Sequence, residues 1–139
     1  MEKKNTNALQ KLSVSIINVV FVLLISAPIF LTYGFGLEYK ISLVVIFLIY
    51  NLIFIFTTKN RCLGMILLNI YWKEEYPLKK QIIYAFLYTL SFSTAVIWIF
   101  FPFDLLLVNL LLIQLPFVLK TGTTVHGYFS GKMSGYVKN

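Results

Sequence analysis

Several apolar segments, each close to twenty residues long, constrain the fold of this chain more than any other feature. A helix of about twenty apolar residues matches the hydrocarbon core of a bilayer. Four segments are predicted to be transmembrane helices: 12–33, 41–58, 81–101 and 103–119. Only 12% of the residues are charged, too few to cover the surface of a soluble domain. The 139 residues therefore predict one membrane domain, an all-α four-transmembrane-helix bundle.

The basic residues predict how these helices are oriented. All of the 12 lysines and arginines except Lys40 fall on the side that holds both termini and the long middle loop. Cytoplasmic loops of membrane proteins are rich in lysine and arginine, so we expect a multi-pass protein of the cytoplasmic (inner) membrane with both termini in the cytoplasm. The same charges predict contacts with anionic lipid head groups. They form no continuous stripe of the kind that binds nucleic acid, so no nucleic-acid partner is expected.

A polar stretch, Lys59–Lys80, contains an apolar decamer, Leu63–Trp72, that is too short to cross the bilayer as a helix. It predicts a small cytoplasmic interfacial element, for which an interfacial helix and short β-strands both remain open. Residues such as Ile70 favour β structure. The tail segment Met133–Val137 falls on the same side. We expect the two segments to pack together as short strands, because pairing satisfies backbone groups near lipid.

Each of the four predicted helices carries a polar side chain at a similar depth from its cytoplasmic end. These residues are Asn18, Asn51, Thr89 and Gln114. Lipid cannot satisfy an amide or a hydroxyl, so we expect them to turn inward as a polar intramembrane cluster with Asn18 at its centre. A structural clamp is favoured over the neutral remnant of an ion or solute site, because no charge is present to bind a cation tightly.

Three short blocks, in order along the chain, resemble the RDD family of small bacterial membrane proteins. In the first block, Lys11 and Asn18 occupy the register of the family's arginine and aspartate. In the second, Thr57 and Gly64 match the outer residues of a Thr-x-Gly-Lys-x-x-x-Gly segment. The first signature acid is thus replaced by an amide.

The third block resembles the family's His-Asp-x-x-x-Gly-Thr segment near the C-terminus. His126 and Gly131 match its histidine and glycine, and Gly127 stands where the family has aspartate. The resemblance implies a single RDD-like domain over residues 1–139, with transport suggested by some members of the family. Activities that depend on the two signature acids are not implied for this chain.

Catalytic and metal-binding residue sets are missing from the sequence. His126 is the only histidine and Cys62 the only cysteine, and all five acidic residues fall outside the predicted hydrocarbon core. A metal site or a catalytic dyad needs several such groups together. We therefore expect no enzyme activity, no cofactor and no bound metal.

The predicted function is that of a small non-catalytic polytopic protein, acting as a membrane subunit, an accessory protein or an immunity-type protein. This function implies a membrane-protein partner or a homo-oligomer. The alternative is an ion or small-solute transporter that works as an oligomer, since four helices enclose little pathway. A membrane enzyme acting on lipid is the third and least favoured class.

Overall fold

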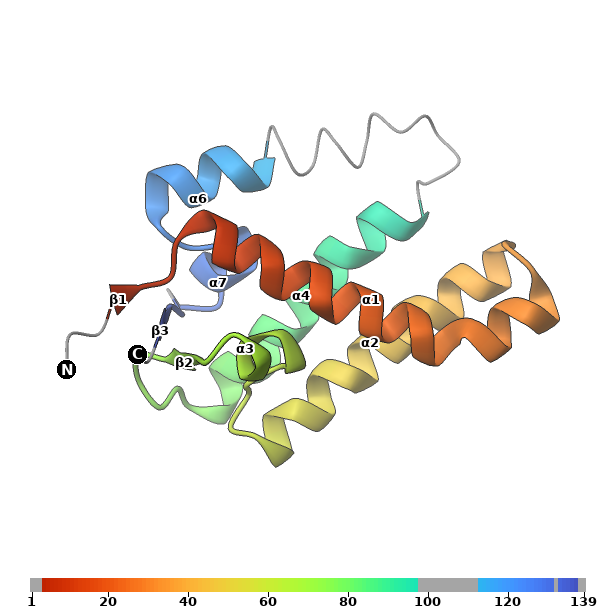
Figure 1. Cartoon of the computed structure of the whole chain (residues 1–139), viewed down its shortest axis with the longest axis horizontal. Coiled ribbons are helices and arrows are strands. Elements are labelled where there is room, and N and C mark those ends of the chain that lie inside the picture. The colour runs from red at the N-terminus through yellow and green to blue at the C-terminus, as the bar shows by residue number, and fades with distance from the viewer. Residues whose placement is uncertain (1–3, 98–112, 132, 138–139) are drawn as a thin grey trace.

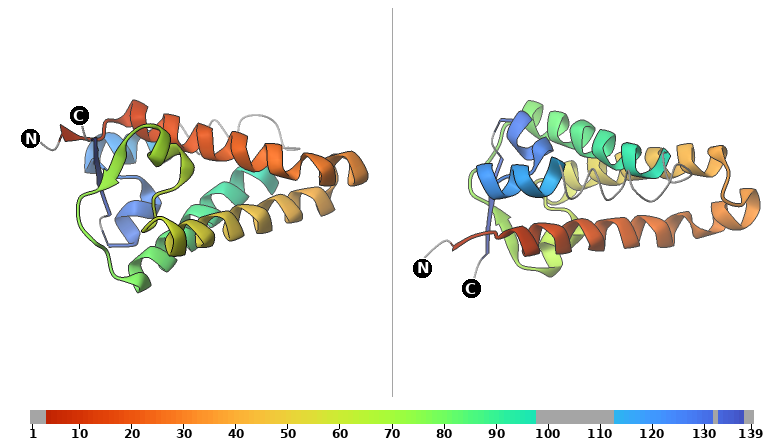
Figure 2. Two further views of the ribbon diagram at one scale, coloured as in Figure 1. Left: turned by 60° about the horizontal axis from the view of Figure 1, so that its bottom comes forward. Right: turned by 90° about the horizontal axis from the view of Figure 1, so that it is seen from above.

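The computed structural model describes residues 4–97, 113–131 and 133–137. Three long helices form its body, and they are α1 (Ala8–Tyr33), α2 (Leu37–Thr57) and α4 (Leu78–Ile97). Helices α1 and α2 form a hairpin, and α4 packs against α2 (Figures 1 and 2). Most of the predicted fourth helix, 103–119, lies outside the described residues. Its C-terminal part lies in α6 (Leu115–Thr121).

Short elements gather at the end of the molecule opposite the α1–α2 turn, and this end is called the sheet end below (Figure 1). Besides α6, its elements are α3 (Leu63–Leu67), α7 (Val125–Phe129), β1 (Lys4–Asn5), β2 (Ile70–Trp72) and β3 (Gly135–Val137). The segments before α1, between α2 and α4, and after α6 therefore meet at one end of the molecule (Figure 1).

The helices begin earlier in the sequence than the apolar pattern predicts, because polar residues cap them or form part of their first turns. Asn7 caps α1, because its side chain accepts the Gln10 N–H at 2.8 Å while its own N–H donates to the Gln10 side chain at 3.0 Å. The predicted start of the second helix at Ile41 is wrong, since α2 begins at Leu37. Glu38 lies in its first turn, where a negative charge complements the helix dipole. Apolar periodicity does not register such polar first turns.

Aromatic and aliphatic side chains of the three long helices form one buried core. The rings of Phe47 on α2 and Phe92 on α4 stack with centroids 4.1 Å apart. Val22 on α1 and Leu43 on α2 are buried in the same cluster. This packing joins α2 to both of its neighbours.

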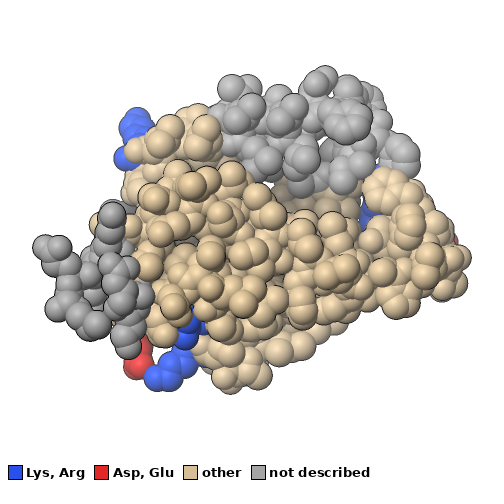
Figure 3. Space-filling model, in the orientation of Figure 1, with Lys and Arg blue, Asp and Glu red and all other residues tan. Residues whose placement is uncertain are grey.

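Two helices, α1 and α2, are long and apolar enough to cross a membrane. Their outward faces are also apolar: Leu24 is 69% exposed, Leu31 83% and Phe56 72%. On the face shown in Figure 3, the charged side chains lie toward the two ends of the molecule, with a wide uncharged band between them. Exposed apolar faces of this extent mark contact with a membrane or another protein.

A three-stranded antiparallel sheet has the order β1–β3–β2. Its register places Ile70 opposite Val137 and Tyr71 opposite Tyr136. The predicted pairing of the decamer with the C-terminal tail is therefore confirmed. The decamer contains both of the predicted alternatives, since Leu63–Leu67 is the helix α3 and Ile70–Trp72 is the strand β2. The third strand, β1, was not predicted, since two residues leave no pattern in the sequence.

The register can be tested by engineered disulfide formation in a Cys62→Ser background. We expect Ile70→Cys and Val137→Cys to form a disulfide readily, because directly opposite residues on one face place their Cβ atoms within bridging distance. The control pairs Ile70→Cys with Tyr136→Cys, whose side chains lie on opposite faces of the sheet. Protection of both thiols from a mass-tagged maleimide measures the bond. Equal protection in the two variants would rule out this register.

Candidate functional site

Asn18 is the buried polar centre of the three long helices. The side chain is fully buried, and its amide oxygen accepts the Tyr50 hydroxyl of α2 at 2.8 Å and the Gly64 N–H of α3 at 3.0 Å. The amide nitrogen donates to the Cys62 thiol at 3.2 Å and to the Tyr88 hydroxyl of α4 at 3.4 Å. Two acceptor and two donor positions of one side chain are thus all used inside the protein.

A backbone group fixes the orientation of this amide. The Gly64 N–H can only donate, so the Asn18 atom that faces it is the oxygen. The preceding N–H, that of Leu63, donates to the Tyr50 hydroxyl at 3.0 Å. Side chains of α1 and α2 therefore satisfy two of the N–H groups that the start of α3 leaves without partners in its own helix.

Gly64 has no room for a side chain. A Cβ atom at this position would lie 2.5 Å from the Val14 carbonyl oxygen on α1. Only glycine allows the start of α3 to approach α1 this closely, and the approach brings the Gly64 N–H to Asn18. Burial raises the pKa of the neighbouring Cys62 thiol, which therefore stays protonated beside the amide.

The other polar residues predicted at this depth lie in separate environments. Asn51 is buried, but its side chain donates to the carbonyl four residues earlier in its own helix at 2.8 Å. Gln114 donates to Ser91 on α4 at 3.0 Å. The buried Thr89 hydroxyl finds no hydrogen-bond partner among the described residues. None of the three bonds to Asn18 within this part of the chain, because a shared depth does not fix the direction in which a side chain points.

The positions that match the RDD blocks divide into two groups. In the first group, Gly64 donates its N–H to Asn18, and Lys11 and His126 line a cavity at the sheet end. Thr57 lies away from them at the end of α2, where its exposed hydroxyl bonds to its own helix. Gly131 follows α7 with a positive φ of 111°, so it serves the turn that leads into β3.

Gly127, the position of the family's second acid, is closely packed in α7. A Cβ atom there would lie 3.0 Å from the Thr124 hydroxyl oxygen and 3.1 Å from the Met133 carbonyl oxygen. The Gly127 N–H also donates to that hydroxyl, which caps α7. A side chain at this position would therefore require Thr124 or the backbone at Met133 to move by a few tenths of an ångström.

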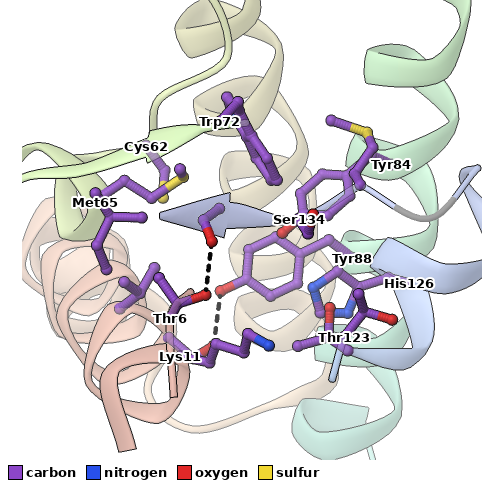
Figure 4. A pocket seen from close by; sticks show the side chains of 16 residues that line it. Thr6, Lys11, Cys62, Met65, Trp72, Tyr84, Tyr88, Thr123, His126 and Ser134 are labelled. Atoms are coloured by element: carbon purple, nitrogen blue, oxygen red, sulfur yellow. Dashed lines mark hydrogen bonds between the residues drawn. The ribbon is translucent and has the colours of Figure 1, made fainter. Parts of the chain in front are cut away.

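A cavity of about 60 Å³ lies at the sheet end beside the Asn18 network (Figure 4). It has room for a few water molecules or one small ion. Its lining includes polar residues of α1, α4 and the C-terminal segment, and they are Lys11, Ser15, Tyr88, Thr123 and His126. The Lys11 ammonium donates to the Gly122 carbonyl. The Tyr88 hydroxyl, which accepts from Asn18, donates to the Ser15 hydroxyl at 3.3 Å.

His126 packs against aromatic rings in the wall of this cavity. Its ring stacks on Tyr88 with centroids 4.5 Å apart and meets the edge of Tyr84 at 4.9 Å. The residue is 6% exposed, and its Nδ1 atom has no hydrogen-bond partner among the described residues. Burial lowers the pKa of His126 to about 3, so the imidazole is neutral at physiological pH.

The tyrosines of this site were missed in the sequence, although a signal was present. Tyr50 and Tyr88 fall inside long apolar segments, where they counted as hydrophobic residues. A buried tyrosine hydroxyl needs a hydrogen-bond partner, so a tyrosine at the depth of Asn18 is a candidate partner for the amide.

Metal ligands are not gathered here: within the described residues, no group of three or more His, Cys, Asp and Glu side chains could hold an ion.

Comparison of the chain with protein-family models, curated proteins and solved structures finds no match. The resemblance to the RDD family therefore remains an expectation from the sequence blocks. What the chain does must follow from the geometry of Asn18 and of the cavity.

The buried histidine predicts a loss of stability in mild acid. The unfolded chain protonates His126 near pH 6.5, whereas the folded chain resists protonation until about pH 3, so acidification below about pH 6.5 favours unfolding. The free energy of unfolding should fall by up to about 1.4 kcal/mol per pH unit over this range. The ordinary pKa of the neighbouring groups Tyr84, Tyr88 and Lys11 is about 10, and burial followed by the charge of Lys73 lowers the pKa of Lys11.

Thermal unfolding in detergent between about pH 8 and pH 5 measures this effect. The control is His126→Phe, which keeps an aromatic ring against Tyr88 but cannot bind a proton. Its unfolding temperature should depend less steeply on pH than that of the unchanged protein. The same slope in both proteins would show that another group is responsible.

Proposed function

We propose that this chain is a four-span, RDD-type protein of the cytoplasmic membrane that acts without catalysis, as a membrane subunit, an accessory protein or an immunity-type protein. The two helices that are long and apolar enough to cross a membrane support the membrane assignment. Between their ends, at 13–33 in α1 and 41–57 in α2, no residue is charged. The described part of α4 beyond Lys80 also lacks charge. The central parts of these three helices are therefore compatible with the hydrocarbon core of a bilayer.

The distribution of cations supports an orientation with the sheet end in the cytoplasm. Only Lys40 lies near the α1–α2 turn among the cations of the described residues. The others belong to or adjoin elements of the sheet end, and they are Lys4, Lys11, Lys59, Arg61, Lys73, Lys79, Lys80 and Lys120. Positively charged segments are retained on the cytoplasmic side during membrane insertion.

The complete internal pairing of Asn18 is the observation that favours a structural role over transport. A polar group that binds a passing ion or solute must offer a free donor or acceptor. Asn18 uses two acceptor and two donor positions on Tyr50, Gly64, Cys62 and Tyr88. The amide is therefore suited to clamp α1, α2, α3 and α4 together.

Reporter fusions test the proposed topology. Fusions after Asn139 and within the loop Lys73–Lys80 should give cytoplasmic signals, and an insertion beside Asp104 should give an external one. Paired reporters, one active only in the cytoplasm and one only outside it, supply the control at each site. A cytoplasmic signal beside Asp104 would mean that the third and fourth segments form a re-entrant hairpin, and the count of four spans would then be wrong.

A matched pair of amide substitutions tests the clamp. Asn18→Leu leaves the buried Gly64 N–H without a partner and removes one hydrogen bond each from the Tyr50 and Tyr88 hydroxyls, so it should destabilise the protein in detergent by about 2–4 kcal/mol. Asn51→Leu removes one bond within α2 and should cost less than about 1 kcal/mol. Thermal unfolding and recovery of a stoichiometric membrane partner are measured for both variants, and the partner should be retained.

Solute flux in reconstituted vesicles distinguishes the competing function. The clamp predicts that Asn18→Leu lowers stability and that the unchanged protein carries no flux that depends on this residue. If Asn18→Leu leaves stability unchanged but abolishes a measurable flux, the clamp is wrong and the transporter takes its place.

A further inference from the structure

The cavity at the sheet end offers several hydrogen-bond donors that the protein does not use. The Lys11 ammonium has three N–H groups, and one donates to the Gly122 carbonyl. The Ser15 hydroxyl accepts from Tyr88 at 3.3 Å, which leaves its own O–H to donate. The Nδ1 atom of His126 is buried without a partner among the described residues, and in one tautomer of the neutral ring it carries a hydrogen. Such a buried group calls for a ligand or a water molecule.

The charge of the cavity favours an anion. Lys11 is the one charged residue in its lining, and no aspartate or glutamate takes part among the residues described there. Burial lowers the pKa of Lys11, and the positive charge of nearby Lys73 lowers it further. Figure 4 shows the end of the Lys11 side chain near Thr123 and His126. A cation would meet only positive charge here.

We propose that this cavity binds a phosphate group through Lys11, Ser15 and His126. A phosphate presents several oxygen acceptors to donors that converge from different sides, and lysine is a common partner for its charge. A cavity of about 60 Å³ has room for a group of this size. The cavity adjoins the Asn18 network through Tyr88 and Cys62, but the clamp does not require a bound phosphate, so this proposal goes beyond it.

Two sources could supply the phosphate group, a lipid head group or inorganic phosphate. Lys11 lies one turn into α1, where the polar first turn gives way to the apolar part of the helix. This position matches the head-group level of a bilayer that the apolar part of α1 would span. Both sources use the same chemistry, and the experiment separates them.

Binding is measured on the full-length protein as a shift in unfolding temperature. In the first arm, potassium phosphate is added to the protein in detergent, with potassium chloride at equal ionic strength as the control. In the second arm, the protein is placed in nanodiscs of phosphatidylcholine alone, or of equal parts phosphatidylcholine and phosphatidic acid. A shift with phosphate in detergent identifies free phosphate as a ligand. A shift with phosphatidic acid alone identifies the phosphate monoester of a lipid, because the control lipid, phosphatidylcholine, carries a phosphodiester.

Substitutions locate the site. Lys11→Gln should weaken phosphate affinity by about tenfold or more, because it removes a charged hydrogen bond. Lys79→Gln, an exposed cation of the same end that does not line the cavity, should leave the affinity unchanged. Should Lys11→Gln fail to fold, Ser15→Ala removes one donor with little change in shape and should weaken binding several-fold.

Two results would overturn the proposal. One is the absence of a shift with both probes beyond that of the chloride and phosphatidylcholine controls. The other is an equal loss of binding in Lys79→Gln and in the cavity variants, which would indicate a diffuse attraction of anions to the basic end. Neither result bears on the stability test at Asn18, so failure of this site is distinguishable from failure of the clamp.

Discussion

The structure depends on the cost of burying one amide. Asn18 is fully buried among helices whose interiors are apolar, and an unpaired amide there would destabilise the fold. Four bonds remove that cost, and they come from α2, α4 and the residues around the start of α3. No single neighbour could satisfy both ends of the amide. The need to pair one side chain completely therefore fixes the relative positions of four elements, which apolar packing alone would leave free to slide.

The sheet end is built outward from this network. Gly64 can approach α1 only because it has no side chain, and the approach starts α3 at a defined point. From α3 the chain enters β2, which pairs with β3, and the Trp72 indole N–H donates to the Asn60 carbonyl at 2.8 Å to hold β2 against the preceding loop. The segment before β3 carries α7, whose His126 stacks on Tyr88. Tyr88 is itself a partner of Asn18, so the cavity is bounded by groups that the same amide positions.

How much of this could be read from the sequence depends on the kind of interaction. The length of the apolar segments predicts the helices α1, α2 and α4. Their first turns are polar, so the apolar pattern places these turns in the segments that precede the helices. The pairing of the decamer with the tail followed from unsatisfied backbone groups, and the structure has it. The depth of Asn18 in an apolar segment marked it as a residue that needs partners. Its partners Tyr50 and Tyr88 count as hydrophobic residues in a pattern, although their hydroxyls at this depth are a usable signal. The contact with Gly64 could not be predicted, because it depends on a backbone approach that no local spacing encodes.

The amide at position 18 also determines which way the hydrogen bonds run toward the cavity. Its nitrogen can only donate, so Tyr88 accepts from Asn18 and passes its own hydrogen to Ser15. Ser15 then keeps a free O–H at the cavity wall. An aspartate at this position would be an acceptor when ionised. Tyr88 would donate to it and could accept from Ser15, so the Ser15 hydroxyl would no longer be free to donate into the cavity. An asparagine at position 18 is therefore consistent with a cavity lined by donors, since this side chain sets the direction of the hydrogen bond from Tyr88 to Ser15.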